Sequence, residues 1–246
     1  MTRLSLLYTL FFLIVSCAGT NSNVPKKPSP APLKKVTYSG PPVVLAILDF
    51  ENNSITDVER LDPLRQGFAG MLSTDLGKFE AIKIVERAKI QAMIQELELS
   101  QTGIVGESTA VQVGKMVGAK NIVFGSFIVI NGQMRVDVRM IEVETSLLVV
   151  AEEMSGPSDS FLHIEKELVQ KIVAGLNVKT SGDTESKALS DSKESFQAAI
   201  FYSRGVEFMD EKKYPLAKKM FQKALEADPH FEAAQKHLES DLFKNQ

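Results

Sequence analysis

The chain has 246 residues, with 28 Lys and Arg against 31 Asp and Glu, a formal net charge of -3. This near balance gives no reason to expect nucleic acid as a partner. One cysteine excludes an internal disulfide framework, so the folded part must be held by its own core. The length is sufficient for one domain of ordinary size and a small second one.

Residues 1–16 have the pattern of an export signal. One arginine precedes Leu4–Val15, which is apolar apart from Ser5 and Thr9. This run is too short to span a bilayer but suits the apolar part of a signal peptide. It ends in Ile14-Val15-Ser16-Cys17, which resembles the lipobox of bacterial lipoproteins. The resemblance implies cleavage before Cys17 and lipidation of its thiol. A plain secretory signal that contains a cysteine is the alternative.

The residues that follow predict where the protein is held. The segment 17–42 is rich in Pro, Ser and Lys, which favours an extended tether between the lipid and a folded domain. Ala18 follows the cysteine, in place of the aspartate that retains many lipoproteins in the inner membrane of enteric bacteria. By this resemblance we expect lipid anchoring in the outer membrane, with the domain facing the periplasm.

The segment 43–178 is predicted to form the main domain, and its first half alternates strands and helices. The continuous apolar run Val43–Phe50 indicates a strand buried on both faces. Asp62 is suited to cap a helix, with Pro63 at its first position. One face of this helix is apolar at four-residue spacing: Leu64, Phe68, Leu72 and Leu76. A short strand, Ile82–Val85, follows.

Two more helices are expected before the pattern changes. Arg87, Ile90, Ile94 and Leu97 have helical spacing. Ser108 is placed to cap a second helix, which Gly118 ends.

The period then changes from helical spacing to the alternation of strands. Asn121–Ile130 is a predicted strand, Asn131-Gly132 is a strong hairpin signal, and the return strand alternates apolar and charged residues. A third strand begins at Leu147, and Ser158 or Asp159 is expected to cap a last helix. The fold class predicted is α/β or α+β: a mixed sheet covered by helices.

The segment from Val43 to about Gly156 resembles the CsgG family of curli-production and related outer-membrane lipoproteins. The matching features are Ala46–Phe50, Val85-Glu86-Arg87, Val117–Lys120 and Phe124-Gly125-Ser126. In the founding type, a ring of subunits builds a membrane barrel from long hairpins. The loop after Phe50, the Asn131-Gly132 turn and the loop from Ser100 to Glu107 are short here. We therefore expect an assembly or regulatory factor, with a secretion-channel subunit as the alternative.

The sequence offers little support for an enzyme. His163, His230 and His237 form no metal-binding spacing, and Gly114-Lys115 lacks the rest of a phosphate loop. A cell-wall-acting enzyme is the remaining alternative, and its candidate residues would be Asp49, Glu86 and Arg87. A strand-to-helix junction and a turn explain these three more simply. No catalytic residue, cofactor or metal ligand is therefore expected.

A flexible linker over 179–195, rich in Ser, Asp and Lys, is predicted to lead into a helical module at 196–246. From Ala198 to Phe231 the chain resembles one tetratricopeptide repeat, two antiparallel helices of about 34 residues. A generic helical hairpin is the alternative. The repeat-packing positions are filled by the following residues: Phe201, Gly205, Phe208, Ala217, Phe221, Ala224, Pro229.

A single repeat is too small to bury a core alone. The module must therefore borrow surface from the CsgG-like domain, a neighbouring subunit or a partner. We expect it to be a handle for envelope proteins or for homo-oligomers.

Overall fold

The computed structural model describes residues 41–97, 106–177 and 193–244, all within one compact unit. The expected signal peptide, Cys17, the tether as far as residue 40, and most of the expected linker lie outside these ranges. Among the described residues, no helix is long and apolar enough to cross a bilayer.

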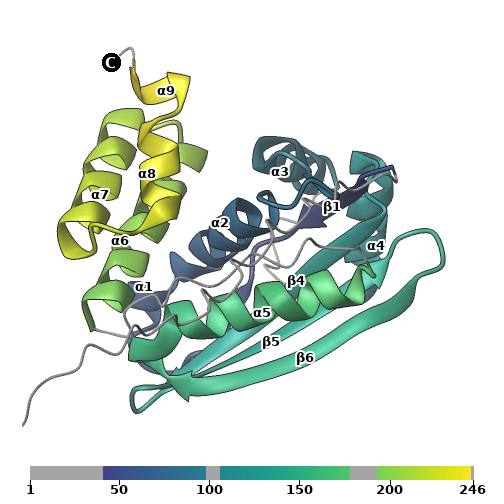
Figure 1. Cartoon of the computed structure of the whole chain (residues 1–246), viewed down its shortest axis with the longest axis horizontal. Helices are drawn as coiled ribbons and strands as arrows, with labels where there is room; N and C mark the ends of the chain where they lie inside the picture. Colours follow the sequence, from purple (N-terminus) through teal and green to yellow (C-terminus); the bar gives the residue numbers. More distant parts are fainter. Residues whose placement is uncertain (1–40, 98–105, 178–192, 245–246) are drawn as a thin grey trace, which may run out of the picture. The chain divides into compact units, whose positions relative to one another are not determined.

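The sheet is mixed, as the sequence predicted. Its strands are β1 (Val43–Ile47), β2 (Glu51–Asn52), β3 (Ile82–Ile84), β4 (Asn121–Ile130), β5 (Gln133–Glu142) and β6 (Leu147–Pro157). Their order is β3-β1-β4-β5-β6, with β2 paired to the far part of β4. Figure 1 shows β1, β4, β5 and β6 of this sheet. The contacts of β1 with β3 and β4 are parallel, whereas β4, β5 and β6 form an antiparallel meander. The short β3 is therefore one edge of the sheet.

Helices cover both faces of the sheet around β1. The helices of this part are α1 (Val58–Leu61), α2 (Leu64–Leu76), α3 (Arg87–Glu96), α4 (Glu107–Val117) and α5 (Phe161–Gly175), which follows a short 3-10 turn, η2 (Ser158–Ser160). Leu45 and Ile47 point to the core beneath α2 and α5, while Ala46 and Leu48 point to the core beneath α3 and α4. The expectation that this strand is buried on both faces is confirmed.

The order of the longer strands and helices was predicted, but β2 and α1, which lie in the expected loop after Phe50, were not, and several ends differ from the prediction. Asp62 ends the short α1, and Pro63, not Asp62, occupies the N-cap of α2. Gly106 and Ser160 take the N-cap positions expected for Ser108 and for Ser158 or Asp159. None of these helix starts has a side-chain cap bond. Tertiary packing, not capping, therefore fixes where these helices begin.

The turn between β4 and β5 is the one that the sequence predicted. Asn131 and Gly132 have φ of 50° and 74°, both in the left-handed region that a two-residue hairpin turn of this type requires. In the middle of β4, a Cβ on Gly125 would lie 2.2 Å from the Asp137 carbonyl oxygen and 2.7 Å from the Phe50 ring. Glycine is thus needed there for close packing.

The C-terminal helices are α6 (Lys193–Asp210), α7 (Tyr214–Ala227), α8 (Glu232–Leu238) and α9 (Asp241–Lys244). They share one continuous core with α2, α5 and the sheet. A row of aromatic rings crosses this core: Phe50 to Phe68 at 4.6 Å, Phe68 to Phe161 at 5.2 Å, and Phe161 to Phe196 at 5.9 Å between centroids. The helices were expected to need surface from the CsgG-like domain, a neighbouring subunit or a partner. In the structure, the CsgG-like domain provides this surface.

Candidate functional site

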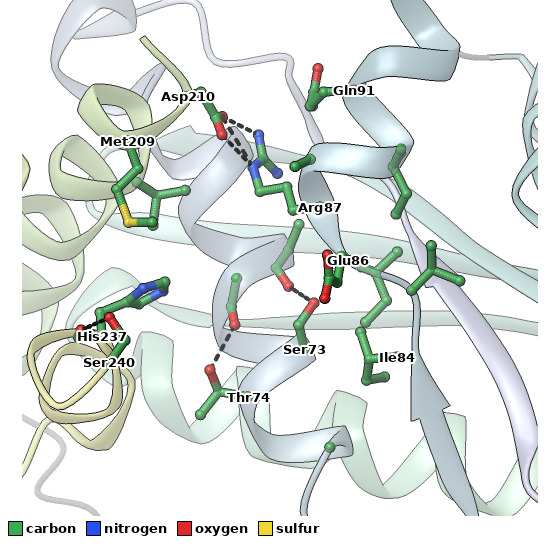
Figure 2. A pocket seen from close by; sticks show the side chains of 18 of the residues that line it. Ser73, Thr74, Ile84, Glu86, Arg87, Gln91, Met209, Asp210, His237 and Ser240 are labelled. Atoms are coloured by element: carbon green, nitrogen blue, oxygen red, sulfur yellow. Dashed lines mark hydrogen bonds and ion pairs between the residues drawn. The ribbon is translucent and has the colours of Figure 1, made fainter. Parts of the chain in front are cut away.

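A cleft of about 1010 Å³ lies between the β3 edge of the sheet and the C-terminal helices. Residues of β3, of α2 and of α3 form one side. The end of α6 and residues of α8 form the other, with His237 and Ser240 facing Ser73 and Thr74 (Figure 2). One wall of the cleft thus comes from the expected main domain, and the other comes from the expected C-terminal helical module.

Arg87, the first residue of α3, joins the two walls. Its guanidinium forms an ion pair with Asp49, after β1, through Nη1 and at 2.9 Å through Nη2. It also donates to Asp210, the last residue of α6, at 3.0 Å from Nε and 2.7 Å from Nη2 (Figure 2). Burial alone would lower the pKa of Arg87, but the two carboxylates raise it above its ordinary value. The three residues form a clamp between β1, α3 and α6.

The clamp changes the interpretation of the charged residues that the sequence singled out. Asp49 was expected to be a turn or cap residue, whereas it is an ion-pair partner of Arg87 and accepts from Gln91 Nε2 at 3.2 Å. Glu86 occupies the N-cap of α3 without a side-chain cap bond, and its side chain is exposed. Asp49 and Arg87 therefore neutralise each other, and Glu86 stands apart from them.

The helix α6 lies directly on α2 because two glycines make room for it. A Cβ on Gly67 would lie 1.7 Å from Ser203 Oγ, and one on Gly70 would lie 2.6 Å from the Tyr202 hydroxyl oxygen. Tyr202 is fully buried, and its hydroxyl lies 3.3 Å from His237 Nε2 on α8. Tyr202 thus reaches both α2 and α8 from the centre of the interface.

Burial makes Tyr202 and His237 a neutral pair. Burial raises the pKa of Tyr202 above its ordinary value, although the charge of Arg87 opposes this. Burial, assisted by Lys236, lowers the pKa of His237 to about 4. The imidazole also stacks on Phe221, with centroids 4.8 Å apart. The pair is therefore uncharged at neutral pH and serves packing between α6, α7 and α8.

A second charged group lies between α2 and α5. Asp75 forms ion pairs with Lys166 and with Lys78, the latter at 2.8 Å, and Lys78 in turn contacts Glu232 on α8. Glu165 is 1% exposed, and its Oε1 has no hydrogen-bond partner among the described residues. Burial, followed by the charge of Asp75, raises the pKa of Glu165 well above its ordinary value. Burial therefore favours the protonated form of Glu165, against the opposing charge of Lys166, whose Nζ lies 3.6 Å from Glu165 Oε2.

The residues predicted to pack the repeat lie in α6, α7 and the turn that follows. Gly205 makes the closest approach, since a Cβ there would lie 2.4 Å from the Phe221 ring. Ala217, Phe221 and Ala224 are fully buried, whereas Phe201 and Phe208 are partly buried at the edge of the core. Pro229 is exposed, two residues after α7 ends.

Sequence reasoning missed Tyr202 and the two glycines of α2. A signal for Tyr202 exists in the four-residue spacing of Ala198, Tyr202 and Val206, all of which are buried. Gly67 and Gly70 lie at three-residue spacing within the helical pattern, which indicates close helix packing. The clamp left no comparable signal, because Arg87 is 38 residues from Asp49 and 123 residues from Asp210 in the sequence.

The described residues hold no group of three His, Cys, Asp or Glu side chains arranged for a metal ion. Gly114, weighed above as part of a phosphate loop, packs against Val143, which would lie 2.6 Å from a Cβ at that position. Its role is close packing of α4 on the sheet.

Residues 41–132 match the family model of the curli production assembly/transport component CsgG. The expected resemblance is confirmed for this segment, which runs from the start of β1 to the turn after β4. The likeness of α6 and α7 to a tetratricopeptide repeat stays a prediction. No curated protein sequence matches the chain.

Solved structures match about half of the chain at low sequence identity. The C-terminal domain of LpoB from Salmonella enterica is 16% identical, over 50% of this chain and 87% of that one, with a TM-score of 0.38. Lipoprotein GNA1162 from Neisseria meningitidis is 8% identical, over 54% and 97%, with a TM-score of 0.39. The PelC dodecamer from Paraburkholderia phytofirmans is 13% identical, over 56% and 90%, with a TM-score of 0.32.

Proposed function

We propose that this chain is a lipid-anchored envelope protein that acts without enzymatic activity, by binding other envelope proteins during assembly, secretion or regulation. The observation that carries the proposal is the cleft of about 1010 Å³ with one wall from the CsgG-like sheet and one from the C-terminal helices. The Arg87 clamp joins these walls, so the cleft is formed before a partner arrives. A preformed groove reduces the entropic cost of association.

The expected anchor and location are part of the same proposal. The lipobox-like end of the export signal at Cys17, with Ala18 after it, supports attachment to the outer membrane on the periplasmic side. The match of residues 41–132 to the CsgG family supports an envelope role. Several acyl chains hold a protein firmly to a bilayer, so the folded part would work within the reach of its tether from the membrane.

Two alternative functions receive less support. For an enzyme acting on the cell wall, Asp49 and Arg87 would have to act on substrate, but each is held by the other and by Asp210 or Gln91. For a secretion-channel subunit, long extensions of the domain would be needed. Within the described ranges, β4 and β5 are joined by two residues.

Photo-crosslinking in living cells tests the proposal. A photoreactive residue at position 83, on the β3 side of the cleft, should form a discrete covalent adduct with an envelope protein. The same residue at Lys120, which is exposed and does not line the cleft, serves as the matched control and should not form that adduct. Equal adducts from both positions, or none from either, would count against the proposal.

The purified full-length protein distinguishes the two alternative functions, a secretion channel and an enzyme. Ring-shaped particles inserted in lipid, seen by electron microscopy, would favour the channel. Release of soluble fragments from purified cell wall, lost in Asp49→Asn, would favour the enzyme.

A further inference from the structure

We propose that the cleft receives an extended, acidic segment of a partner protein, which adds to the sheet as a strand beside β3. This inference rests on the proposed function, because it names the kind of partner that the same cleft would bind. Three observations carry it: the open edge of β3, the basic side chains around it, and the apolar side chains between them.

The backbone of β3 has an unused side. Val43 N–H donates to the Ala81 carbonyl at 2.8 Å, and Val85 N–H donates to the Leu45 carbonyl at 2.9 Å. In a parallel pair the backbone groups of alternate residues point to opposite sides, so those of Ile82 and Ile84 point away from β1. Ile82 N–H is bonded to the Phe79 carbonyl at 2.9 Å. In the described chain, the Ile84 N–H and the carbonyls of Ile82 and Ile84 are left without a strand to pair with.

This unpaired edge lies inside the cleft. Residues 82–85 all line it, together with residues of α2 on one side and of α3 on the other. A strand added there would continue the sheet by one position and would lie between the two layers of helices. Edge strands are protected in most proteins, and an open one within a groove is the usual setting for strand addition by a peptide.

The charges around the cleft favour acidic side chains in the occupant. Lys83 on β3, Lys212 after α6 and Lys236 on α8 all line the cleft, are exposed, and have no ion-pair partner in the described part of the chain. The single positive charge of Arg87 faces two carboxylates, Asp49 and Asp210, and Glu86 is the one unpaired acid among the described lining residues. The three lysines and Arg87 still exceed these three acids in number. The cleft is thus basic although the whole chain has a formal net charge of -3.

Apolar side chains complete the pattern. Ile82, Ile84 and Val85 line one side, and Met209, Tyr214 and Leu242 line the other. Side chains of an added strand alternate between its two faces, so a segment with alternating acidic and apolar residues fits both features.

The chain's own tether does not have this chemistry. Residues 18–40 contain Lys26, Lys27, Lys34 and Lys35 and no Asp or Glu, and the same segment holds four prolines. Its positive charge would be repelled by the three lysines, and proline cannot donate to a strand ladder. The tether is therefore not the occupant, and the proposal assigns the acidic segment to another protein.

Peptide binding to the purified full-length lipoprotein in detergent tests this assignment. The probe is a fluorescent hexapeptide of alternating Glu and Val, followed by anisotropy. We expect saturable binding that weakens at least tenfold when every backbone nitrogen of the peptide is methylated, because methylation removes the donors but keeps the charge. A Lys-Val peptide of equal length should not bind.

Variants locate the site. Lys83→Glu and Lys236→Glu should each weaken binding several-fold, whereas the matched control Lys120→Glu should not. Ile84→Pro removes the outward N–H of β3 and should also weaken binding; Lys83→Glu keeps the test valid if the proline destabilises the fold. Absent binding, equal affinity for the methylated peptide, or an equal loss in Lys120→Glu would each overturn the proposal.

The crosslinking experiment separates this inference from the proposed function. An adduct from position 83 that forms equally well in the Ile84→Pro background would reject strand addition and leave a protein-binding cleft in place. The absence of an adduct in the unaltered chain would reject the function itself.

Discussion

Arg87 is the residue on which the two parts of the chain depend most directly. Its side chain is 23% exposed, and Asp49 and Asp210 are 19% and 32% exposed, so the three charges are only partly screened by solvent. Fully buried pairs cost about 3–5 kcal/mol to break by loss of one partner, and surface pairs cost much less. The free-energy cost of removing one partner from the Arg87 clamp should lie between these limits.

Asp210→Asn should therefore destabilise the C-terminal helices by about 1–2 kcal/mol, since one of the two carboxylates on a partly buried guanidinium is lost. Hydrogen exchange followed by mass spectrometry should show faster exchange at the end of α6 and in α8, with β4 and β5 unchanged. Glu211→Gln is the matched control, because among the described residues Glu211 pairs with the exposed Lys213 alone, at 2.9 Å. Equal exchange in both variants would contradict the clamp.

Glu165 should make stability depend on pH. Its pKa is raised by burial in the folded state, whereas the carboxyl in the unfolded chain has its ordinary pKa of 4.5. The native state therefore retains a proton that the unfolded chain releases, and this contribution to stability is lost as pH rises from 4.5 through the folded pKa. A tenfold difference in proton affinity between the folded and unfolded states corresponds to about 1.4 kcal/mol of stability.

The variant Glu165→Gln cannot ionise, so its free energy of unfolding, relative to that of the unaltered chain, should increase as pH rises above 4.5. Urea titrations at several pH values measure this difference. The contribution of His237, whose pKa is lowered to about 4, is common to both proteins and cancels. Glu167→Gln, on the exposed side of α5, is the control. A difference that stays constant with pH would show that Glu165 is ionised in the fold.

At the scale of elements, the contact between α2 and α6 explains why a single helical hairpin is stable here. The four-residue stripe of Leu64, Phe68, Leu72 and Leu76 is fully buried in the core, and each such side chain contributes about 2 kcal/mol by burial. Gly67 and Gly70 let α6 approach α2 closely. The helix α2 thus serves the sheet and the C-terminal helices at once.

Gly67→Ala tests this contact, because its effect on the free energy of unfolding should be opposite to the usual one. In an exposed helix interior, the change from Gly to Ala stabilises by about 1 kcal/mol. Here the new Cβ would lie 2.9 Å from the Ser203 Cα, so we expect destabilisation of about 1–3 kcal/mol in urea unfolding. Adding Ser203→Gly should recover part of the loss, a positive coupling in a double-mutant cycle. Stabilisation by Gly67→Ala alone would mean that α6 does not lie on α2.

The sequence predicted elements better than it predicted the contacts between them. The hairpin at Asn131-Gly132 and the strand Asn121–Ile130 were predictable because turn chemistry and alternation are local signals. The starts of α2 and α4 were missed by one or two residues, because packing, not capping, sets them. The ion pairs of Arg87 join residues far apart in the chain, and no local pattern encodes such a pairing.

At the scale of the whole molecule, the expected attachment to the membrane is through one residue, the lipidated Cys17. Cys17→Ser should move the protein from the membrane fraction to the soluble fraction, because the thiol that would accept the diacylglyceryl group is lost. Fractionation followed by immunoblotting measures this, with Ser16→Ala as a control that keeps the cysteine. Membrane retention of Cys17→Ser would reveal a second attachment.

Crosslinking in cells from both walls of the cleft tests whether one partner contacts the sheet and the C-terminal helices together. Photoreactive residues at Lys83 on β3 and at Lys236 on α8 should capture the same envelope protein, and both adducts should decrease in an Arg87→Ala background. Adducts with unrelated proteins from the two positions, or capture that is unaffected by Arg87→Ala, would contradict a docking cleft shared by the sheet and the C-terminal helices.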